Sequence, residues 1–495
     1  MKLPSLPKIK YRKYAPPIIG ITLIPIIVTG ILAYVIYKVM PYLPPEIPLF
    51  YNLPWGIDQL AEKDYLWGAI VVNTLIIMIN SSIIIILYKN TLFLLSKIMA
   101  IATMLIVFLN SYYAFRIISV STTITLVIPE WIKLTLIPLS LALVTTLIVT
   151  PIVIKMAYKF NWIDDPLRHK HPGMLLTKPT PRAGGFAFYL GILIPSILIL
   201  PITSSQKIAG ILIGALINVI VGLVDDRKDV NPYLRLALQV AAVLITVLSG
   251  IILIYIPNPF GDAILLDQFK YVFNFIGEHS IYYFSVLAAV IWMLWTMNFM
   301  SFANGTDGVY AGLVSISAAV IMILMFQSLN DDPSLDIYIK LAALTAGAGL
   351  GMAVYTWPPQ KLLWGYGATS AGLIIAALSI LGSTKVATTL IVLMIPFLDG
   401  AFAVARRLKR GQSPFWGDRE HLHHRLLEGL GWSKHKVALF YWCSTLTFAA
   451  IGILTKGQTR ALSMASLGAL VILGIALLNL LKKPEMKQNI NKSDE

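Results

Sequence analysis

The sequence predicts an all-α fold, a polytopic transmembrane bundle of about fourteen helices. Of the 495 residues, 57% are hydrophobic and only 13% are charged, whereas soluble proteins carry about 25% charged residues. Apolar runs of about 18 to 25 residues recur along the chain, and each can span ~30 Å of hydrocarbon as a helix. The period-two alternation of a membrane β-barrel is absent, so helices must satisfy the backbone polar groups in lipid.

The apolar runs divide into three spans before residue 125 and about eleven after it. We expect the spans at 17–39, 67–88, 92–115, 132–157, 185–201, 207–224, 234–255, 281–302, 308–327, 338–356, 361–382, 386–405, 436–454 and 461–481. Accordingly, we predict a membrane region of unknown role at 1–125, a working domain at 126–482 and a polar cytoplasmic tail at 483–495.

The basic residues predict the orientation. With the basic segment at 2–13 in the cytoplasm, about 29 of the 39 Lys and Arg residues lie inside and about 10 outside, as the positive-inside rule requires. The net charge of +15 therefore indicates topology and contact with anionic membrane lipids, not nucleic acid. The single cysteine, Cys443, excludes disulfides within the chain.

Polar residues that carry chemistry concentrate on the predicted cytoplasmic face. Of the seven histidines only His279 maps outside, and the acidic clusters map to the same face as the other six. The segment GLVDDRKDVNP ends the sixth predicted span with Asp225 and Asp226. Adjacent carboxylates repel and favour a hard cation, of which Mg²⁺ with a phosphate substrate is the usual case. A solvated helix end is the alternative.

The segment SPFWGDREHLHHRLL places three histidines among acidic and basic residues. Zinc is one interpretation, but His423 and His424 are adjacent and face different sides of a helix. Imidazoles beside arginines suit a pyrophosphate, and a solvated basic loop is the bland alternative. A second basic loop, RHKHPGMLLTKPTPRAGG, leads into a Gly-Gly helix start suited to phosphate.

Two ionisable residues lie inside apolar runs, where a charge costs roughly 3 kcal/mol by insertion scales. Asp399 lies in LIVLMIPFLDGAFAVARR, so we expect it to face the bundle interior. Arg235 lies at the edge of the seventh predicted span and needs a partner.

Five segments, taken in order, resemble the signature loops of the polyprenyl-phosphate N-acetylhexosamine-1-phosphate transferases, glycosyltransferase family 4. They read DDPLRHKHP…PTPRAGG, GLVDDRKDVNP…RLALQ, NFMSFANGTDG, PPQKLLWGYGATSAG and RGQSPFWGDREHLHHRL, and the resemblance covers roughly 130–480. It implies attack of a polyprenyl phosphate on the β-phosphorus of a UDP-sugar, which releases UMP. It also implies Mg²⁺, with Mn²⁺ as an alternative, and UDP-GlcNAc as donor, in cell-envelope glycan synthesis.

The resemblance also implies the site residues. The catalytic set is Asp225, Asp226, Asp307 and His424, and the three aspartates also form the metal site. The substrate-binding set is Lys170, Arg182, Asn298, Asn304, Lys361, Asp418, Arg419, His421, His423 and Arg425. The family's fold places these residues at the cytoplasmic face of the cell membrane. A homodimer is the alternative to a monomer.

This chain departs from the family at three positions. The family pattern N-x-x-N-x-x-D-G-x-D-G has an asparagine and an aspartate where this chain has Ser301 and Asn304, and Gly365-Tyr366 stands where the family has Gly-Asp. A phenol is neutral near pH 7, so an acidic group that the family uses at the metal is lost. The departure favours two alternatives: a rearranged catalytic site, or a protein that binds UDP-sugar or lipid phosphate without turnover. A transporter or flippase is a further alternative, but the charges cluster at one end of the spans.

Overall fold

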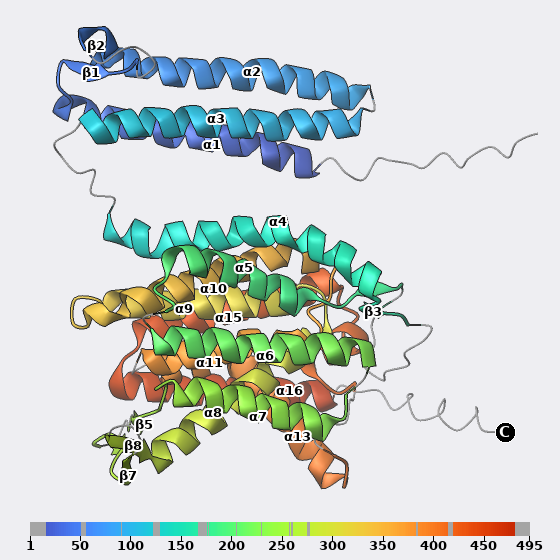
Figure 1. Ribbon diagram of the computed structural model, residues 1–495. Helices are drawn as coiled ribbons and strands as arrows, with labels where there is room; N and C mark the ends of the chain where they lie inside the picture. Colours follow the sequence, from blue (N-terminus) through green and yellow to red (C-terminus); the bar gives the residue numbers. More distant parts are fainter. Residues whose placement is uncertain are drawn as a thin grey trace, which may run out of the picture. The chain divides into compact units, whose positions relative to one another are not determined.

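The computed structural model describes residues 16–50, 56–90, 92–121, 129–166, 176, 178–203, 205–228, 230–256, 258, 261–274, 278–382, 385–413 and 419–480. The chain divides into two compact units, Met1–Ile128 and Pro129–Glu495 (Figure 1). The predicted tail at 483–495 lies outside the described residues.

The first unit is a small bundle of three helices. Its elements are α1 (Pro16–Val39), η1 (Met40–Tyr42), β1 (Glu46–Pro48), η2 (Ile57–Gln59), β2 (Leu60–Glu62), η3 (Lys63–Trp67), α2 (Gly68–Lys89) and α3 (Phe93–Ser121). Strands β1 and β2 pair antiparallel. Amide side chains join α2 to α3, because Asn73 donates to Ser111 at 3.1 Å and Asn110 donates to Asn73 at 2.9 Å. Such bonds satisfy polar groups where no water is present.

The second unit is a helical bundle with short strands at its ends. Its helices are η4 (Ile132–Leu136), α4 (Ile137–Phe160), α5 (Gly184–Ile199), α6 (Gln206–Lys228), α7 (Pro232–Leu248), α8 (Tyr283–Phe302), η5 (Ala303–Gly305), α9 (Val309–Gln327), η6 (Pro333–Leu335), α10 (Asp336–Thr356), η7 (Tyr366–Ala368), α11 (Thr369–Leu381), α12 (Lys385–Val392), α13 (Met394–Lys409), α14 (Leu422–His424), η8 (Arg425–Gly429), α15 (Lys434–Leu454) and α16 (Gly457–Leu480). Its strands are β3 (Ile163–Asp164), β4 (Thr180–Pro181), β5 (Tyr255–Ile256), β6 (Ile264–Leu265), β7 (Lys270–Asn274) and β8 (Glu278–Tyr282), paired antiparallel as β3–β4, β5–β6 and β7–β8.

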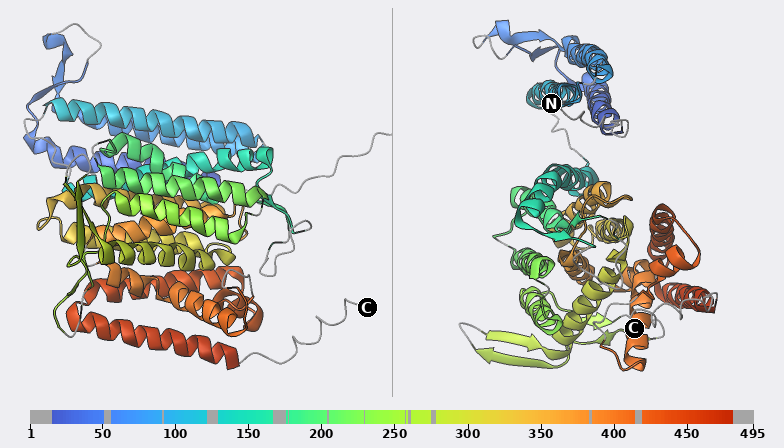
Figure 2. Two further views of the ribbon diagram at one scale, coloured as in Figure 1. Left: turned by 60° about the horizontal axis from the view of Figure 1, so that its bottom comes forward. Right: turned by 90° about the vertical axis from the view of Figure 1, so that its right-hand side faces the viewer.

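The two ends of this bundle differ. Figure 1 shows β3 at one end and β5, β7 and β8 at the opposite end. Helix α6 ends, and α7 begins, at the end that carries β3. Figure 2 shows α16 at the rim of the bundle, where it packs against α13 and α15.

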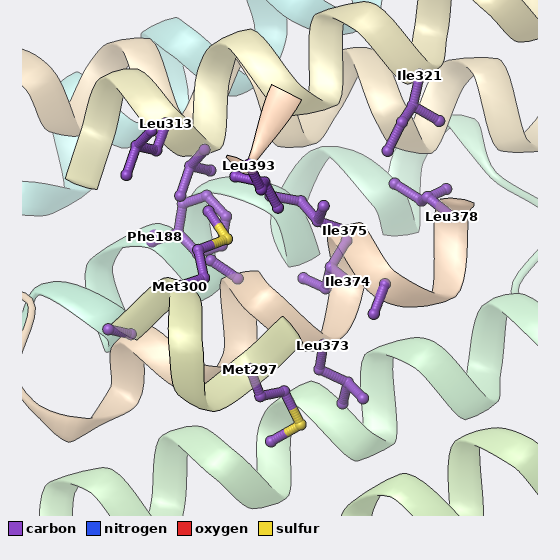
Figure 3. Close-up of a cluster of buried hydrophobic side chains, with 14 of the residues drawn as sticks. Phe188, Met297, Met300, Leu313, Ile321, Leu373, Ile374, Ile375, Leu378 and Leu393 are labelled. Carbon is purple, nitrogen blue, oxygen red and sulfur yellow. The ribbon is translucent and has the colours of Figure 1, made fainter. Parts of the chain in front are cut away.

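Helix α11 forms the centre of the bundle. Its sequence, TSAGLIIAALSIL, is apolar on all sides, which is typical of a helix surrounded by others. Figure 3 shows Leu373, Ile374 and Leu378 of α11 among Phe188 of α5 and Met297 of α8. All five side chains are almost fully buried. Because α11 is fixed from every side, the loop that leads into it is fixed as well.

The predicted all-α membrane bundle is confirmed. Among the described residues, ten helices are long and apolar enough to cross a membrane, or eleven with the bent pair α12 and α13. Helices α5, α7 and α11 are apolar but shorter. The span predicted at 361–382 is wrong at its start, because residues 361–365 form a loop and Gly365 has φ +64°. The span predicted at 386–405 is bent by 77° next to Pro396, which lacks an N–H to continue the helix.

Close helix packing around the loop before α11 predicts a steric effect at Gly222. A Cβ added there would lie 2.4 Å from the backbone nitrogen of Gly367. We expect Gly222→Ala to destabilise the protein by roughly 1–3 kcal/mol, as overpacking does. Thermal unfolding of the purified protein in detergent measures the effect. The control is Gly474→Ala, where a Cβ meets open space and helix propensity should stabilise by roughly 0.5–1 kcal/mol. Equal melting temperatures for the two variants would contradict the prediction.

Candidate active site

The loop at 357–366, between α10 and α11, gathers polar residues from two other segments. The backbone N–H of Gln360 donates to Asp307 at 3.1 Å, and the backbone N–H of Tyr366 donates to Asp226 at 3.2 Å. The Asn304 side chain donates to the carbonyl of Gly365 at 3.4 Å. The loop thus brings the end of α6 and the turn after α8 to one place.

Strand-like pairing fixes the other side of this loop. Leu363 forms a parallel bridge with Arg182, and its N–H donates to Pro181 at 2.8 Å. Gly365 lies directly against Asp226, since a Cβ added to it would be 2.1 Å from Oδ2. With φ at +64°, glycine is the residue that this close approach requires.

Three buried carboxylates each hold a basic side chain. The Nε of Arg182 lies 3.0 Å from Asp226, and Nη1 of Arg235 lies 3.0 Å from Asp225. The Nζ of Lys434 lies 2.8 Å from Asp307.

The two kinds of charge differ in exposure. The carboxylate side chains are only 2–3% exposed, whereas the basic side chains are 25–32% exposed. Cations therefore lie between the carboxylates and solvent, where an anionic substrate can reach them.

Tyr366 lies among these paired carboxylates and cations. The guanidinium of Arg235 lies 4.8 Å from the centre of the Tyr366 ring, which is a cation–π distance. Nearby, Gln239 and Asn298 join α7 to α8 by an amide pair with distances of 3.1 and 3.4 Å. Ser301 donates to the carbonyl of Met297 within its own helix. The Tyr366 position therefore supplies a backbone N–H and an aromatic face, where the family pattern has a carboxylate.

The histidine segment forms a second group next to the first. His421 is buried between Asp399 and Arg407, at 2.9 Å and 3.3 Å. The His423 ring stacks on that of His421, with an interplanar angle of 6°. The two groups meet at Gly305, because a Cβ there would lie 2.3 Å from Nε2 of His423. They therefore form one continuous site.

His423 has the most unusual environment in this segment. It is 2% exposed, and neither ring nitrogen has a hydrogen-bond partner among the residues that the structure describes. Burial, and to a lesser degree the neighbouring His424 and His421, hold the pKa of His423 well below 6.5. The imidazole is therefore neutral near pH 7 and has both a donor and an acceptor to offer.

Basic side chains fix the start of the histidine segment. Glu420 accepts from Arg410 at 2.9 Å, and its carboxylate forms an ion pair with Nε of Arg406 at 3.0 Å. The Nε of Arg425 donates to the carbonyl of Glu420 at 2.8 Å. Arg419 is half exposed and lies 3.9 Å from Glu428, which also lies 3.8 Å from His424.

Most of the predicted site residues lie in these two groups. The first group contains Arg182, Asp225, Asp226, Asn298, Asn304 and Asp307, and the second contains Arg419, His421, His423, His424 and Arg425. The side chain of Lys361 is exposed, and its backbone N–H donates to Tyr355. Lys170 and Asp418 lie outside the described residues. Asp399 is buried, as expected.

Two residues of the site were missed by the sequence interpretation. Lys434 pairs with Asp307 across 127 positions. Arg407 lies in a basic run at the end of α13, yet it is only 3% exposed. Its place two turns after Asp399 in an apolar helix was the available signal, because two buried ionisable groups on one helix suggest a shared partner.

The donors fit a hard cation only in part. Carboxylate oxygens are the ligands that Mg²⁺ prefers, and one or two of them suffice where substrate phosphates complete the shell. Asp225 and Asp226 meet that requirement. Within the described part of the chain, no three His, Cys, Asp or Glu side chains form a group that could hold a metal ion. The structure therefore fits a metal held jointly with the substrate.

Comparisons with known proteins agree on one family. Residues 208–383, from α6 to the end of α11, match the model of glycosyl transferase family 4. A probable undecaprenyl-phosphate N-acetylglucosaminyl 1-phosphate transferase of Bacillus subtilis is 27% identical over 67% of this chain and 87% of the relative. A decaprenyl-phosphate N-acetylglucosaminephosphotransferase of Mycobacterium leprae is 30% identical over 60% of this chain and 79% of the relative. An undecaprenyl-phosphate alpha-N-acetylglucosaminyl 1-phosphate transferase of Escherichia coli is 26% identical over 61% of this chain and 78% of the relative.

The pairing of Arg182 with Asp226 predicts a stability effect. We expect Arg182→Met to destabilise the protein by about 2 kcal/mol, because Asp226 is left buried with one cation fewer. Partial exposure of Arg182 keeps the cost below the roughly 3–5 kcal/mol of fully buried pairs. Adding Asp226→Asn should recover part of the loss, as measured by thermal unfolding. Lys178→Met, on an exposed residue of the same segment, is the control and should change little. A double variant less stable than Arg182→Met would contradict the pairing.

Proposed function

The chain belongs to glycosyl transferase family 4, and on that premise we propose that it transfers N-acetylglucosamine 1-phosphate from UDP-N-acetylglucosamine to a membrane polyprenyl phosphate. An oxygen of the lipid phosphate bonds to the β-phosphorus of the UDP-sugar, the bond from that phosphorus to the UMP oxygen breaks, and UMP leaves. The product is a lipid-linked pyrophosphoryl sugar for envelope glycan synthesis. The observation that carries the proposal is the layer of partly exposed cations over buried carboxylates.

That layer suits the charge of the reaction. Two phosphate-bearing substrates must approach each other, and phosphoryl transfer depends mainly on positioning and charge neutralisation. Arg182, Arg235 and Lys434 supply positive charge from three different segments. A phosphate monoester is mostly dianionic at pH 7, since its second pKa is about 6, so little proton removal is needed before attack.

Mg²⁺ is the proposed cofactor, with Mn²⁺ as the alternative. Asp225 and Asp226 would hold it, and when bound it would neutralise charge on the pyrophosphate oxygens. Asp307 and Lys434 then remain available to orient the nucleotide, and His423 to bind a polar group of sugar or phosphate.

We propose that this site faces the cytoplasm. The loops and helix ends on its side of the bundle contain Arg182, Arg227, Lys228, Lys361, Arg406, Arg407, Lys409, Arg410, Arg419, Arg425, Lys434 and Lys436. Such an excess of basic residues is typical of cytoplasmic loops. UDP-sugars and a lipid phosphate can meet at that surface.

Release of UMP by the purified protein in lipid tests the proposal. We expect release with UDP-N-acetylglucosamine that requires both polyprenyl phosphate and Mg²⁺ and stops with a chelator. Asp226→Asn should lower the rate by roughly 100-fold or more, because a charge that orders the site is lost. The control Asp331→Asn changes an exposed residue in the turn between α9 and α10 and should keep the wild-type rate. UDP-sugar binding without UMP release from any donor would favour a protein that binds without turnover.

Tyr366 allows a separate test of the metal. Because Tyr366 borders Asp226 and Arg235, Tyr366→Asp would add a carboxylate to the site. We expect half-maximal UMP release at a roughly tenfold lower Mg²⁺ concentration, since more carboxylate ligands raise affinity. Tyr366→Phe adds no ligand, is the matched control and should keep the wild-type dependence. An unchanged Mg²⁺ dependence in Tyr366→Asp would place position 366 out of reach of the metal.

A further inference from the structure

Helix α13 holds the histidine segment through three of its side chains and that of Arg410, which directly follows it. It is bent by 77° from α12. Arg406 and Arg410 bind Glu420, Arg407 contacts His421, and Asp399 contacts both His421 and Leu422. Three consecutive residues, 420–422, are thus held by one helix just before the stacked imidazoles begin.

Asp399 fixes two donors at once. Its Oδ2 lies 2.9 Å from Nδ1 of His421, and its Oδ1 accepts from the backbone N–H of Leu422 at 2.9 Å. The carboxylate therefore orients the imidazole and also satisfies the first free N–H of the short helix α14. A carboxylate has oxygens enough for both bonds, whereas an amide has only one acceptor.

Hydrogen-bond chemistry determines the protonation state of His421. A carboxylate accepts, so Nδ1 must carry the proton that it shares with Asp399. A guanidinium only donates, so Nε2, at 3.3 Å from Arg407, must be the unprotonated acceptor. His421 is therefore a neutral imidazole in a single tautomer, and both of its ring nitrogens are used within the protein.

We propose that Asp399 and Arg407 are positioning residues that lock His421 as an anchor of the histidine segment, and that His421 does not itself bind substrate. This inference rests on the proposed function, and it revises the role that the family resemblance implied for His421. The imidazole left for the substrate is His423, whose ring stacks on that of His421 and whose two nitrogens lack partners in the described part of the chain.

Substitution of His421 by asparagine separates an anchor from a ligand. The amide nitrogen of asparagine occupies nearly the place of Nδ1 and can still donate to Asp399, but nothing replaces Nε2. For an anchor, we expect His421→Asn to keep UMP release within roughly tenfold of wild type and His421→Ala to lose roughly 100-fold. If the two variants lose UMP release to the same extent and have equal melting temperatures, the proposal is overturned.

A double-variant cycle tests whether Asp399 acts through His421. We expect Asp399→Asn to slow UMP release by roughly 30-fold, and the double variant Asp399→Asn with His421→Ala to be no slower than His421→Ala alone. Independent roles would instead multiply the two losses. The control variant is Lys409→Met, which removes an exposed cation at the end of α13. It should release UMP at the wild-type rate.

A tautomer measurement distinguishes failure of this proposal from failure of the proposed function. In protein with ¹⁵N-labelled histidine, assigned by comparison with His421→Asn, we expect Nδ1 of His421 protonated and Nε2 unprotonated at pH 7. Arg407→Met removes the donor at Nε2, so the Nε2 resonance should shift in that variant. A wild-type His421 that is protonated on Nε2 would overturn the proposal even if UMP release is normal. The expected tautomer without UMP release would leave the anchor intact and remove the function.

Discussion

The backbone of the loop at 357–366 is the constraint on which the rest of the site depends. Its N–H groups neutralise part of the charge on Asp226 and Asp307, which come from segments about 80 residues apart in sequence. Backbone donors do not change when a side chain changes. The loop can therefore hold both carboxylates, although it has Tyr366 at the position where the family pattern has an aspartate. Tyr366 in place of the family's aspartate removes a metal ligand, but the backbone that holds the two carboxylates is kept.

Burial of the carboxylates explains why their cations are exposed. An ionised carboxylate inside a helical bundle costs several kcal/mol unless paired and hydrogen-bonded. Asp225 meets this cost with Arg235 and the N–H of Val230, and Asp226 meets it with Arg182 and the N–H of Tyr366. Since the acids occupy the inner positions, the long basic side chains extend toward solvent. The same pairs that stabilise the folded site thus offer positive charge to an incoming phosphate.

The sequence predicted the helices well because apolar runs in lipid permit little else. The ends of the helices were harder to predict, as the loop before α11 shows. Gly365 interrupts an apolar run there because its backbone lies directly against Asp226. Among the site residues, Arg235 could be expected to seek a partner within its own helical hairpin. Lys434 could not be expected to pair with Asp307, because a contact between distant segments leaves no periodic signal in either. Arg407 was hidden for a related reason, since a basic run at a helix end is usually a membrane anchor.

Neutrality of the imidazoles complements the charged half of the site. His423 is neutral because it is buried, and His421 is neutral because a carboxylate and a guanidinium occupy its two nitrogens. The charges of Asp399 and Arg407 then balance across the ring between them. His423 therefore offers hydrogen bonds without adding net charge beside Gly305, where the histidine segment meets the carboxylate group. A neutral imidazole at this place suits an uncharged part of the substrate, whereas the cations over the carboxylates suit its pyrophosphate.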